Sequence, residues 1–386
     1  MVDYTQQQFD QKDTTFCKAY QGDYGPEIQK IWAKDYITDP LMSVFFGYND
    51  MSNCMSWYLA QCTDGPVRKE FRREDADPKD LTRIVKDVAK YLGATKVGIC
   101  ELKPYHVYSR KAQKVDMVEG HWGDPIDLKH KYAISLVFPL NHELMKASPS
   151  FVDEAEIGFA YQKAALMCCQ LAAFIRECGY SAMGHHHRRD YVIHVPIAVD
   201  AGLGECGRNG YLVTPEYGPC CRITTVTTDM PLIPDHPVDY GIDKFCEICK
   251  KCAHNCPSQS IPKGEKVEVR GAKKWQLDAD KCFKFWLSKP DKWFGCAVCM
   301  KTCPWNKKNT WYHRLSVKLV KAIPAFGHVL LWLDDMVYGK HPKYHVDWIN
   351  FDAVLRDVEE INKKGGSDYI KQKQAEAKKS KEKSIG

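Results

Sequence analysis

The stretch that decides the fold of one domain reads Cys246-Glu-Ile-Cys249-Lys-Lys-Cys252-Ala-His-Asn-Cys256-Pro257. Three cysteines separated by two residues each, then a fourth after three more residues and a proline, have the spacing that holds [4Fe–4S] clusters. The first three thiolates reach irons of one cluster, whereas the fourth points away and binds a second cluster. The stretch therefore predicts two clusters, and the remaining ligands must come from elsewhere in the chain.

A second run reads Cys296-Ala-Val-Cys299-Met-Lys-Thr-Cys303-Pro304. It lacks the first cysteine of a complete motif, and the lone upstream Cys282 makes up the number. Crossed ligation then predicts two sets of thiolates. The first set is Cys246, Cys249, Cys252 and Cys303, and the second set is Cys256, Cys282, Cys296 and Cys299. These runs predict a bacterial-ferredoxin-like domain at residues 241–310 that transfers electrons.

Zinc is the alternative ligand, because four closely spaced thiolates also suit that ion. Zinc ribbons rarely contain C-x3-C-P twice, however, and a single zinc ion gives no reason for crossed fourth ligands. The chain has 18 cysteines, and most of those outside the two sets are expected to be small buried apolar residues. Many free thiols beside two clusters indicate assembly in a reducing compartment.

Composition excludes some functions. The chain of 386 residues has a net charge of +6, and most of the basic excess lies in residues 361–386, which we expect to be a disordered tail. A nucleic-acid-binding face is therefore not expected. No apolar run approaches the roughly 18–20 residues needed to span a bilayer, and residues 1–5 show no export signal. We expect a cytoplasmic protein; an exported, membrane-associated mature form whose leader was removed is the alternative.

The residues before the ferredoxin-like domain predict a mixed α/β core. Apolar residues at helical spacing predict helices at residues 81–92 and 153–178, the second capped by Gly179. Short apolar runs predict strands at residues 97–102, 132–138, 192–199 and 222–228. Residues 201–210 form a glycine-rich loop without the Lys-Ser/Thr ending or the register of nucleotide-binding motifs. The loop indicates only that the backbone passes close to a cofactor or to another chain segment.

The chain resembles the corrinoid- and iron–sulfur-dependent reductive dehalogenases over roughly residues 80–350. Both cysteine runs carry the resemblance, together with residues 158–163, 174–182, 195–205, 211–218, 228–232, 244–246, 304–306 and 333–340. The resemblance implies a flavin-reductase/nitroreductase-like, cobalamin-binding α/β core within residues 1–240, into which the two-cluster domain at 241–310 is inserted. It also implies that residues 311–360 pack back on the core. No D-x-H-x-x-G run is present to supply a cobalt-ligating histidine, which agrees with a base-off cobalamin.

This resemblance implies cob(I)alamin-mediated reductive cleavage of a carbon–halogen bond, with electrons delivered through the two clusters. The reduced carbon must then be protonated. Tyr161 matches the helix tyrosine of the family and is the expected proton donor. A phenol has a reference pKa near 10 and needs a cation to stabilise the tyrosinate after transfer. We expect Arg208 to be that cation, with Arg222 as its rival.

The corrinoid is expected to contact the glycine-rich loop and the histidine run. The candidate cofactor-binding residues are His185, His186, Gly202, Gly204, Glu205 and Tyr217. Three consecutive histidines cannot all face one ion on a regular element, so residues 185–187 are expected either in a loop near the nucleotide tail of the cofactor or in a solvated turn.

The expected partners are a small organohalide substrate and an external low-potential electron donor, which could be a ferredoxin, a flavodoxin or a membrane donor. One alternative function is an epoxyqueuosine reductase, although that family usually has tryptophan where this chain has Glu205. The other is an iron–sulfur electron carrier without an active site of its own, which would bind no corrinoid.

Overall fold

The structure is a computed structural model that describes residues 8–26, 28–29, 54–73, 75–287, 295–307 and 310–342. The predictions for residues 343–360 and for the tail at 361–386 lie outside these ranges. No helix in the described part of the chain is long and apolar enough to cross a membrane.

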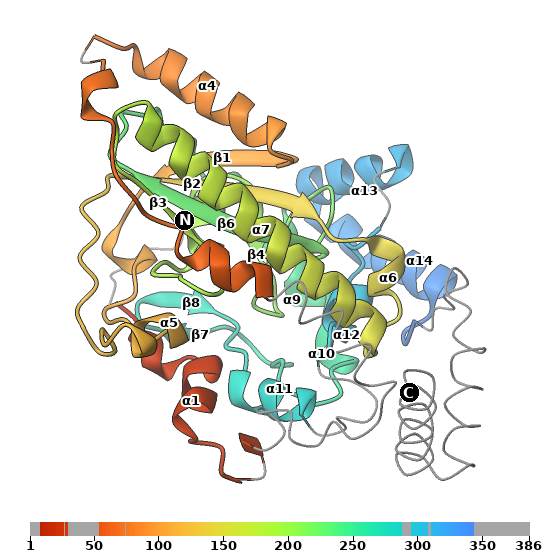
Figure 1. Ribbon diagram of the computed structural model, residues 1–386. Helices are drawn as coiled ribbons and strands as arrows, with labels where there is room; N and C mark the ends of the chain where they lie inside the picture. The colour runs from red at the N-terminus through yellow and green to blue at the C-terminus, as the bar shows by residue number, and fades with distance from the viewer. Residues whose placement is uncertain are drawn as a thin grey trace, which may run out of the picture.

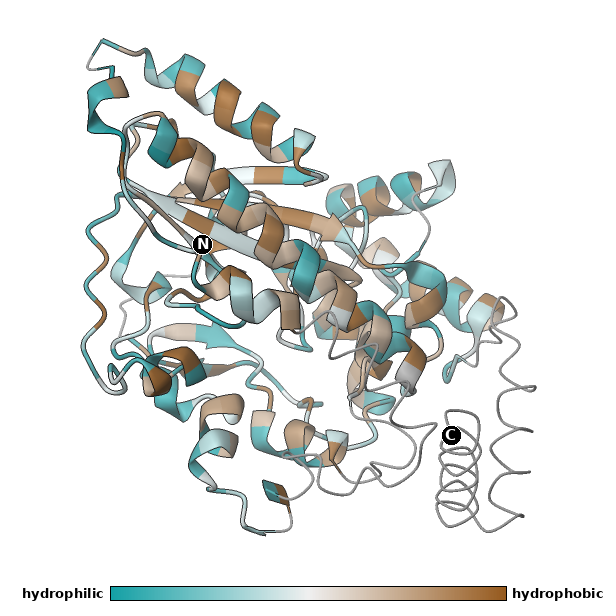
Figure 2. Ribbon diagram, in the orientation of Figure 1, coloured by the Kyte–Doolittle hydropathy of each residue, from teal (hydrophilic) through white to brown (hydrophobic). Residues whose placement is uncertain are grey.

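A four-stranded antiparallel sheet forms the centre of the molecule (Figure 1). Its strands, in spatial order, are β1 (Lys96–Glu101), β2 (Tyr132–Pro139), β6 (Cys221–Thr228) and β3 (Ala182–His185). The register places Ile99 opposite Ile134, and Ile134 opposite Val226, so that apolar side chains line up across the sheet. Figure 2 shows the apolar character of β1 and β2. Strands β1, β2 and β6 were predicted, and β3 was not.

Two helices, α4 (Pro78–Tyr91) and α7 (Phe151–Glu177), pack on one face of the sheet and bury its main apolar core. Both were predicted. Asp77 accepts a hydrogen bond from the Lys79 N–H and so caps α4. At the start of α7 the Ser150 hydroxyl accepts from the Val152 N–H, and the Asp153 carboxylate accepts from the Ser150 N–H. Such reciprocal capping satisfies N–H groups that the first turn leaves unpaired.

The opposite face of the sheet carries α8 (His194–Asp200), and here the predicted strand at 192–199 is wrong. Val192 makes only an isolated bridge with Val107 before the chain turns into a helix. Valine and isoleucine favour strands locally, but Pro196 lacks the N–H that a strand ladder needs and fits the first turn of a helix. Burial of Ile197 against the sheet then favours the helix.

The cysteine-rich region lies beyond one end of the sheet (Figure 1). Its elements are α9 (Ile242–Cys249), α10 (Lys251–His254), the hairpin β7 (Val267–Val269) and β8 (Ala272–Lys274), α11 (Ala279–Trp286) and α12 (Val298–Lys301). A further pair, α13 (Trp311–Ala322) and α14 (Gly327–Tyr338), packs against α9. The His313 side chain also hydrogen-bonds the Pro215 carbonyl of the core at 3.1 Å.

Smaller elements complete the described fold. They are α1 (Thr15–Gln21), α5 (Lys114–Val118), α6 (His142–Met145), the short pair β4 (Glu205–Cys206) and β5 (Leu212–Val213), and the 3-10 turns Gln11–Asp13, Lys69–Phe71, Pro104–His106 and Pro324–Phe326. The β4–β5 pair matters most for function, because it joins the core to the cysteine-rich region.

Candidate functional site

The structure places the members of each predicted set of cysteines near one another. Burial raises the pKa of the Cys303 thiol, and so does its proximity to the thiols of Cys246, Cys249 and Cys252, the other members of the first set. Eight thiols in two groups of four suit two four-iron cubes, the chemistry expected of the motif.

The second set shows the same pattern. Burial raises the pKa of Cys299, and the neighbouring thiols of Cys296, Cys282 and Cys256 raise it further. The two sets also approach each other, because Cys299 influences the pKa of Cys252 as well. Helices α10 and α12, which carry Cys252 and Cys299, are in contact, so the two sets lie side by side within the cysteine-rich region.

Tyr161 lies between two nitrogen-rich side chains. The Cζ atom of Arg222 lies 4.1 Å from the centroid of the Tyr161 ring, and the His187 ring centroid lies 4.2 Å from the same centroid with the two ring planes inclined by 41°. The three residues come from α7, β6 and the turn after β3, which the sheet brings together because β3 pairs with β6. We call Tyr161, His187 and Arg222 the tyrosine pocket.

Several polar atoms around this pocket are enclosed but have no hydrogen-bond partner among the described residues. They are both ring nitrogens of His187, Nε2 of His186 and Nε of Arg222. Buried polar groups are normally hydrogen-bonded, so unpaired ones call for an explanation such as a missing ligand. The polar amides and phosphate of a corrinoid could satisfy such groups, and the residues present therefore fit that cofactor.

The tyrosine pocket adjoins the second set. Burial raises the pKa of Tyr211 well above its ordinary value, and the thiols of Cys299 and Cys282, together with Tyr161, act in the same direction. Tyr211 thus links the pocket to two members of the second set. Glu154, about two helical turns before Tyr161, has a pKa raised by burial and by Asp153, and the charge of Arg222 opposes that rise.

Arg208 does not belong to the tyrosine pocket. Its buried guanidinium donates hydrogen bonds to the carbonyls of Cys246 at 2.9–3.0 Å, Pro262 at 2.9 Å and Gly264 at 2.8 Å, and it stacks on Trp275 at 4.4 Å. These contacts bind the cysteine-rich region to the β4–β5 loop. The contacts favour a structural role in place of the predicted catalytic one, and it is the rival Arg222 that lies beside Tyr161.

Other segments of the chain pack closely against the glycine-rich loop. A Cβ atom at Gly202 would lie 2.4 Å from the His236 carbonyl oxygen, and one at Gly204 would lie 2.3 Å from that of Val213. The Glu205 carboxylate accepts hydrogen bonds from N–H groups at the start of α9, among them that of Asp243 at 2.8 Å. Close backbone packing and helix capping explain these three residues, and they argue for structural roles in place of the predicted cofactor role.

The histidine run is enclosed, so the solvated-turn alternative does not hold for it. His185 ends β3 and its Nε2 bonds the Thr227 hydroxyl at 2.8 Å, whereas His186 and Arg189 pair their backbones in a tight turn. Burial lowers the pKa of His187 well below its ordinary value, and the nearby charge of Arg188 adds to this. Tyr217, the remaining candidate, is half-buried and packs against the apolar cluster around α8.

His187 and Tyr211 are site residues that the sequence did not single out. His187 follows two other histidines in sequence, and only the pairing of β3 with β6 shows that it, and not its neighbours, faces Tyr161. Tyr211 lies within a segment that matches the family, but its position near Cys299 depends on the fold of the β4–β5 loop.

Comparison with known proteins gives a consistent result. A family model described as a 4Fe-4S dicluster domain matches residues 245–307, which contain all eight cysteines. The chain is 32% identical over 321 residues to the tetrachloroethene reductive dehalogenase of Sulfurospirillum multivorans, an alignment that covers 75% of this chain and 62% of that protein. It is 25% identical over 259 residues to the epoxyqueuosine reductase of Cyclobacterium marinum, covering 58% and 79% of the two chains.

Among solved structures, the catabolic reductive dehalogenase NpRdhA in complex with 3-bromo-4-hydroxybenzoic acid is similar with a TM-score of 0.77 and 28% identity. That match covers 88% of this chain and 48% of the other. A reductive dehalogenase structure described in terms of B12-dependent dehalogenation is similar with a TM-score of 0.76 and 28% identity, covering 87% and 47%. The chain thus spans about half to three-fifths of the length of these reductive dehalogenases.

Proposed function

We propose that this chain, which is similar to tetrachloroethene reductive dehalogenases and to the reductive dehalogenase NpRdhA, reduces a carbon–halogen bond of an organohalide at the tyrosine pocket. The observation that carries this proposal is the position of the Tyr161 phenol, which lies against Arg222 and His187 and borders the second set of cysteines. A proton donor, a cation and an electron supply meet there, which is the combination that reductive dehalogenation requires.

A corrinoid bound beside this pocket would supply the strongly reducing metal centre that attacks the organohalide. The α/β core within residues 1–240 is proposed to hold it in a base-off form. His186, His187 and Arg222 would direct their unpaired nitrogens toward its polar groups or toward the substrate. The [4Fe–4S] clusters proposed at the two sets of thiolates would deliver electrons one at a time.

The protein residues would complete the reaction by moving a proton. Tyr161 is proposed to donate its phenolic proton to the carbon that has lost the halide, a role in which a positioned acid contributes about 10²–10⁴-fold. Arg222 cannot give up its own proton and instead stabilises the tyrosinate that forms. His187, kept neutral by burial, is proposed to relay a proton to the tyrosinate between turnovers, giving up the proton of one ring nitrogen as the other ring nitrogen takes one from the solvent.

The first test is anaerobic purification with cobalamin supplied, followed by metal analysis, EPR spectroscopy and an organohalide screen. The expected result is about eight irons and about one cobalt per chain, with halide release. Tyr161→Phe should then lose about 10²–10⁴-fold in rate while retaining iron and cobalt. Tyr91→Phe, which alters an exposed tyrosine on α4, should leave the rate unchanged.

The same experiment separates the alternatives. A chain that binds iron but no cobalt under these conditions would be an electron carrier without its own active site. A chain that binds both metals, ignores organohalides and reduces epoxyqueuosine in a tRNA stem loop would be an epoxyqueuosine reductase. Either result would reject the dehalogenase proposal.

A further inference from the structure

The two sets of cysteines lie against different parts of the fold. Cys299 of the second set and Tyr211 pack against the apolar cluster that contains Ala160 and Ala164 of α7, so the second set lies on the side where the chemistry is proposed. The first set belongs to a different apolar cluster, in which Cys246 and Cys303 pack with Phe245, Trp305 and Val320 of α13. An external donor should therefore approach near α13 and α14.

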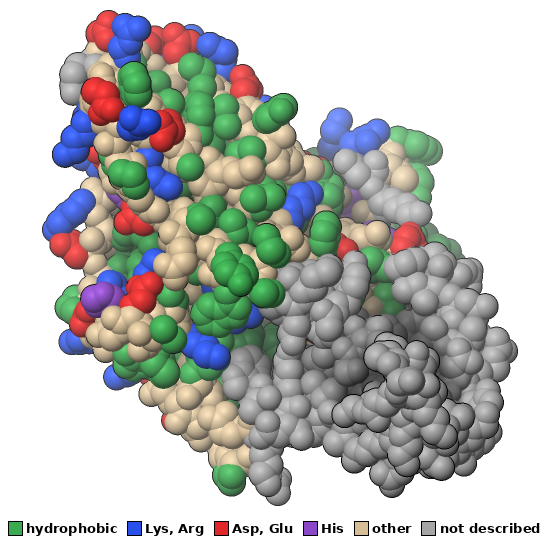
Figure 3. Space-filling view, in the orientation of Figure 1, with side chains coloured by type: hydrophobic (Ala, Val, Ile, Leu, Met, Phe, Trp, Pro, Cys, Tyr) green, Lys and Arg blue, Asp and Glu red, His purple; other side chains and the backbone are tan. Residues whose placement is uncertain are grey.

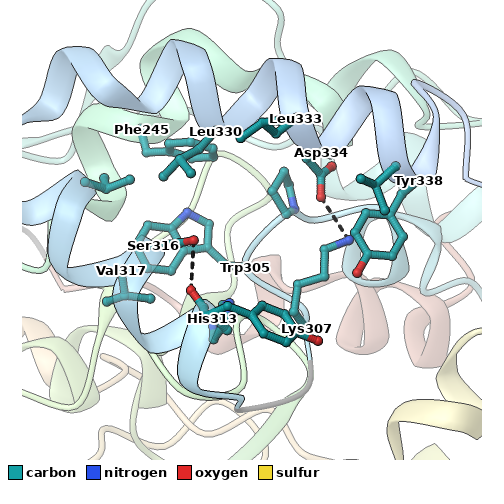
Figure 4. A pocket seen from close by; sticks show the side chains of 14 residues that line it. Phe245, Trp305, Lys307, His313, Ser316, Val317, Leu330, Leu333, Asp334 and Tyr338 are labelled. Atoms are coloured by element: carbon teal, nitrogen blue, oxygen red, sulfur yellow. Dashed lines mark hydrogen bonds and ion pairs between the residues drawn. The ribbon is translucent and has the colours of Figure 1, made fainter.

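A cavity of about 410 Å³ opens at this place, between α13, α14 and the first set (Figure 4). Its floor includes Phe245 and Trp305, whose ring centroids lie 5.8 Å apart at nearly right angles. Phe245 directly precedes Cys246, and Trp305 lies two residues after Cys303. A partner side chain that enters the cavity would therefore contact two aromatic rings that lie next to cysteines of the first set.

The surface around the cavity is apolar and exposed. On α14 the side chains of Trp332, Met336 and Val337 are 62–65% exposed, and Trp311 at the start of α13 is 70% exposed. Monomeric soluble proteins rarely expose such contiguous apolar groups without a binding role. A central apolar patch with an aromatic pocket suits the insertion of an apolar side chain from a partner.

The charges around this patch indicate the sign of the charge expected on a partner protein. Helix α13 contains Arg314, Lys318 and Lys321 and no acidic residue, and Figure 3 shows basic side chains over α13. The two acids of α14 are neutralised, because Asp334 pairs with Lys307 at 3.0 Å and Asp335 pairs with Lys251 at 2.9 Å. The surface is therefore apolar with a basic margin, and its complement is acidic.

We propose that the α13–α14 face is the docking site of a small acidic protein that carries a low-potential one-electron centre. This inference rests on the proposed function, because it assumes that the first set holds a cluster. On docking, the centre of the partner is oxidised by one electron and the cluster at the first set is reduced by one. No bond is made or broken and no proton moves, and the electron then passes to the second set.

The test measures cluster reduction by stopped-flow absorbance, with a chemically reduced acidic [2Fe–2S] ferredoxin or a flavodoxin hydroquinone as the probe. Lys318→Glu/Lys321→Glu reverses two charges of α13, and Lys79→Glu/Lys90→Glu makes the same charge change on the distant α4. The α13 variant should slow reduction by about tenfold or more at low ionic strength, and the difference should shrink as salt screens the charges. The α4 variant should behave as the wild type.

Titanium(III) citrate, which needs no docking site, should reduce the clusters of all variants equally. If titanium(III) citrate does not reduce the clusters of the wild type, the proposed function is rejected, and the docking proposal that rests on it is rejected too. A further variant, Trp332→Gln, keeps the charges and should weaken binding of the probe through the apolar patch. Equal rates for the α13 and α4 variants would overturn the proposal. The proposal would also be overturned if the α13 variant changed its oligomeric state, or its binding to anionic phosphatidylglycerol vesicles, without any change in the rate at which the probe reduces it.

Discussion

At the scale of single residues, two arginines that look equivalent in the sequence differ in their surroundings. Arg222 stacks on Tyr161, whereas Arg208 donates its hydrogen bonds to four backbone carbonyls of the cysteine-rich region. A guanidinium that is fully engaged by carbonyls is not available to stabilise a tyrosinate. The structure therefore separates a proposed catalytic arginine from a structural one.

Arg222→Gln should lower the rate of organohalide reduction by about 10²-fold or more, since the tyrosinate loses its stabilising charge. Its iron content should stay unchanged. Arg208→Gln should have the opposite profile: iron is lost during purification, because buried carbonyls lose their donors, while the remaining loaded fraction keeps its rate. Iron analysis combined with steady-state kinetics distinguishes the two. A slow but fully loaded Arg208→Gln would reverse the assignment.

His185 predicts a dependence of stability on pH. Burial lowers its pKa to about 3 in the folded protein, whereas an unfolded histidine titrates near 6.5. The unfolded chain therefore binds a proton first, so stability is complete above about pH 6.5 and falls by up to about 1.4 kcal/mol per pH unit below it. The His185→Gln variant has no imidazole to protonate and so does not lose stability in this way. The urea midpoint of the wild type should therefore exceed that of the variant by less at pH 5 than at pH 7. A constant advantage would contradict the prediction.

At the scale of elements, helices and strands with a clear period were predictable, and α8 was not. The alternation and spacing of apolar residues identified α4, α7, β1, β2 and β6 to within a few residues. Around Pro196 the local preference of valine and isoleucine for strands competes with burial against the sheet, and the sequence alone does not show which is stronger. β3, with Gly184 and only four residues, gives no period to detect.

The start of α9 offers a test at this scale. Glu205 accepts hydrogen bonds from N–H groups of its first turn, and a carboxylate there also interacts favourably with the helix dipole. Glu205→Ala should therefore lower the free energy of unfolding by about 1–2 kcal/mol, measured by the shift in urea midpoint. Corrinoid content should not change. Loss of corrinoid at unchanged stability would restore the predicted cofactor role of this residue.

At the scale of the whole molecule, the cysteine spacing predicted the two sets, but the tyrosine pocket could not be assembled from the sequence. Ligand spacing is a local property of short runs. The contact of Tyr161 with Arg222 and His187 depends instead on how β3, β6 and α7 are arranged, and residues 26 to 61 positions apart meet only in the fold. For the same reason the sequence favoured Arg208, which lies within the glycine-rich loop.

Cys282 lies outside both cysteine runs and provides a test of the complete two-cluster region. Cys282→Ser should lower the iron content from about eight to about four or fewer per chain and abolish organohalide reduction. Cys178→Ser alters a half-buried cysteine that belongs to neither set and should retain both iron and activity. Eight irons in the Cys282→Ser protein would show that another residue completes the second set.

The hydrogen bonds of Arg208 have a consequence for the speed of electron tunnelling. Tunnelling slows exponentially with the gap between donor and acceptor, so a relay performs well only if its spacing is rigid. Arg208 fastens the backbone at Cys246 to the β4–β5 loop, and Tyr211, three residues further along that loop, borders the second set and Tyr161. In the proposed relay, this one buried guanidinium would keep the gaps between the two sets and the tyrosine pocket constant while substrate and product exchange.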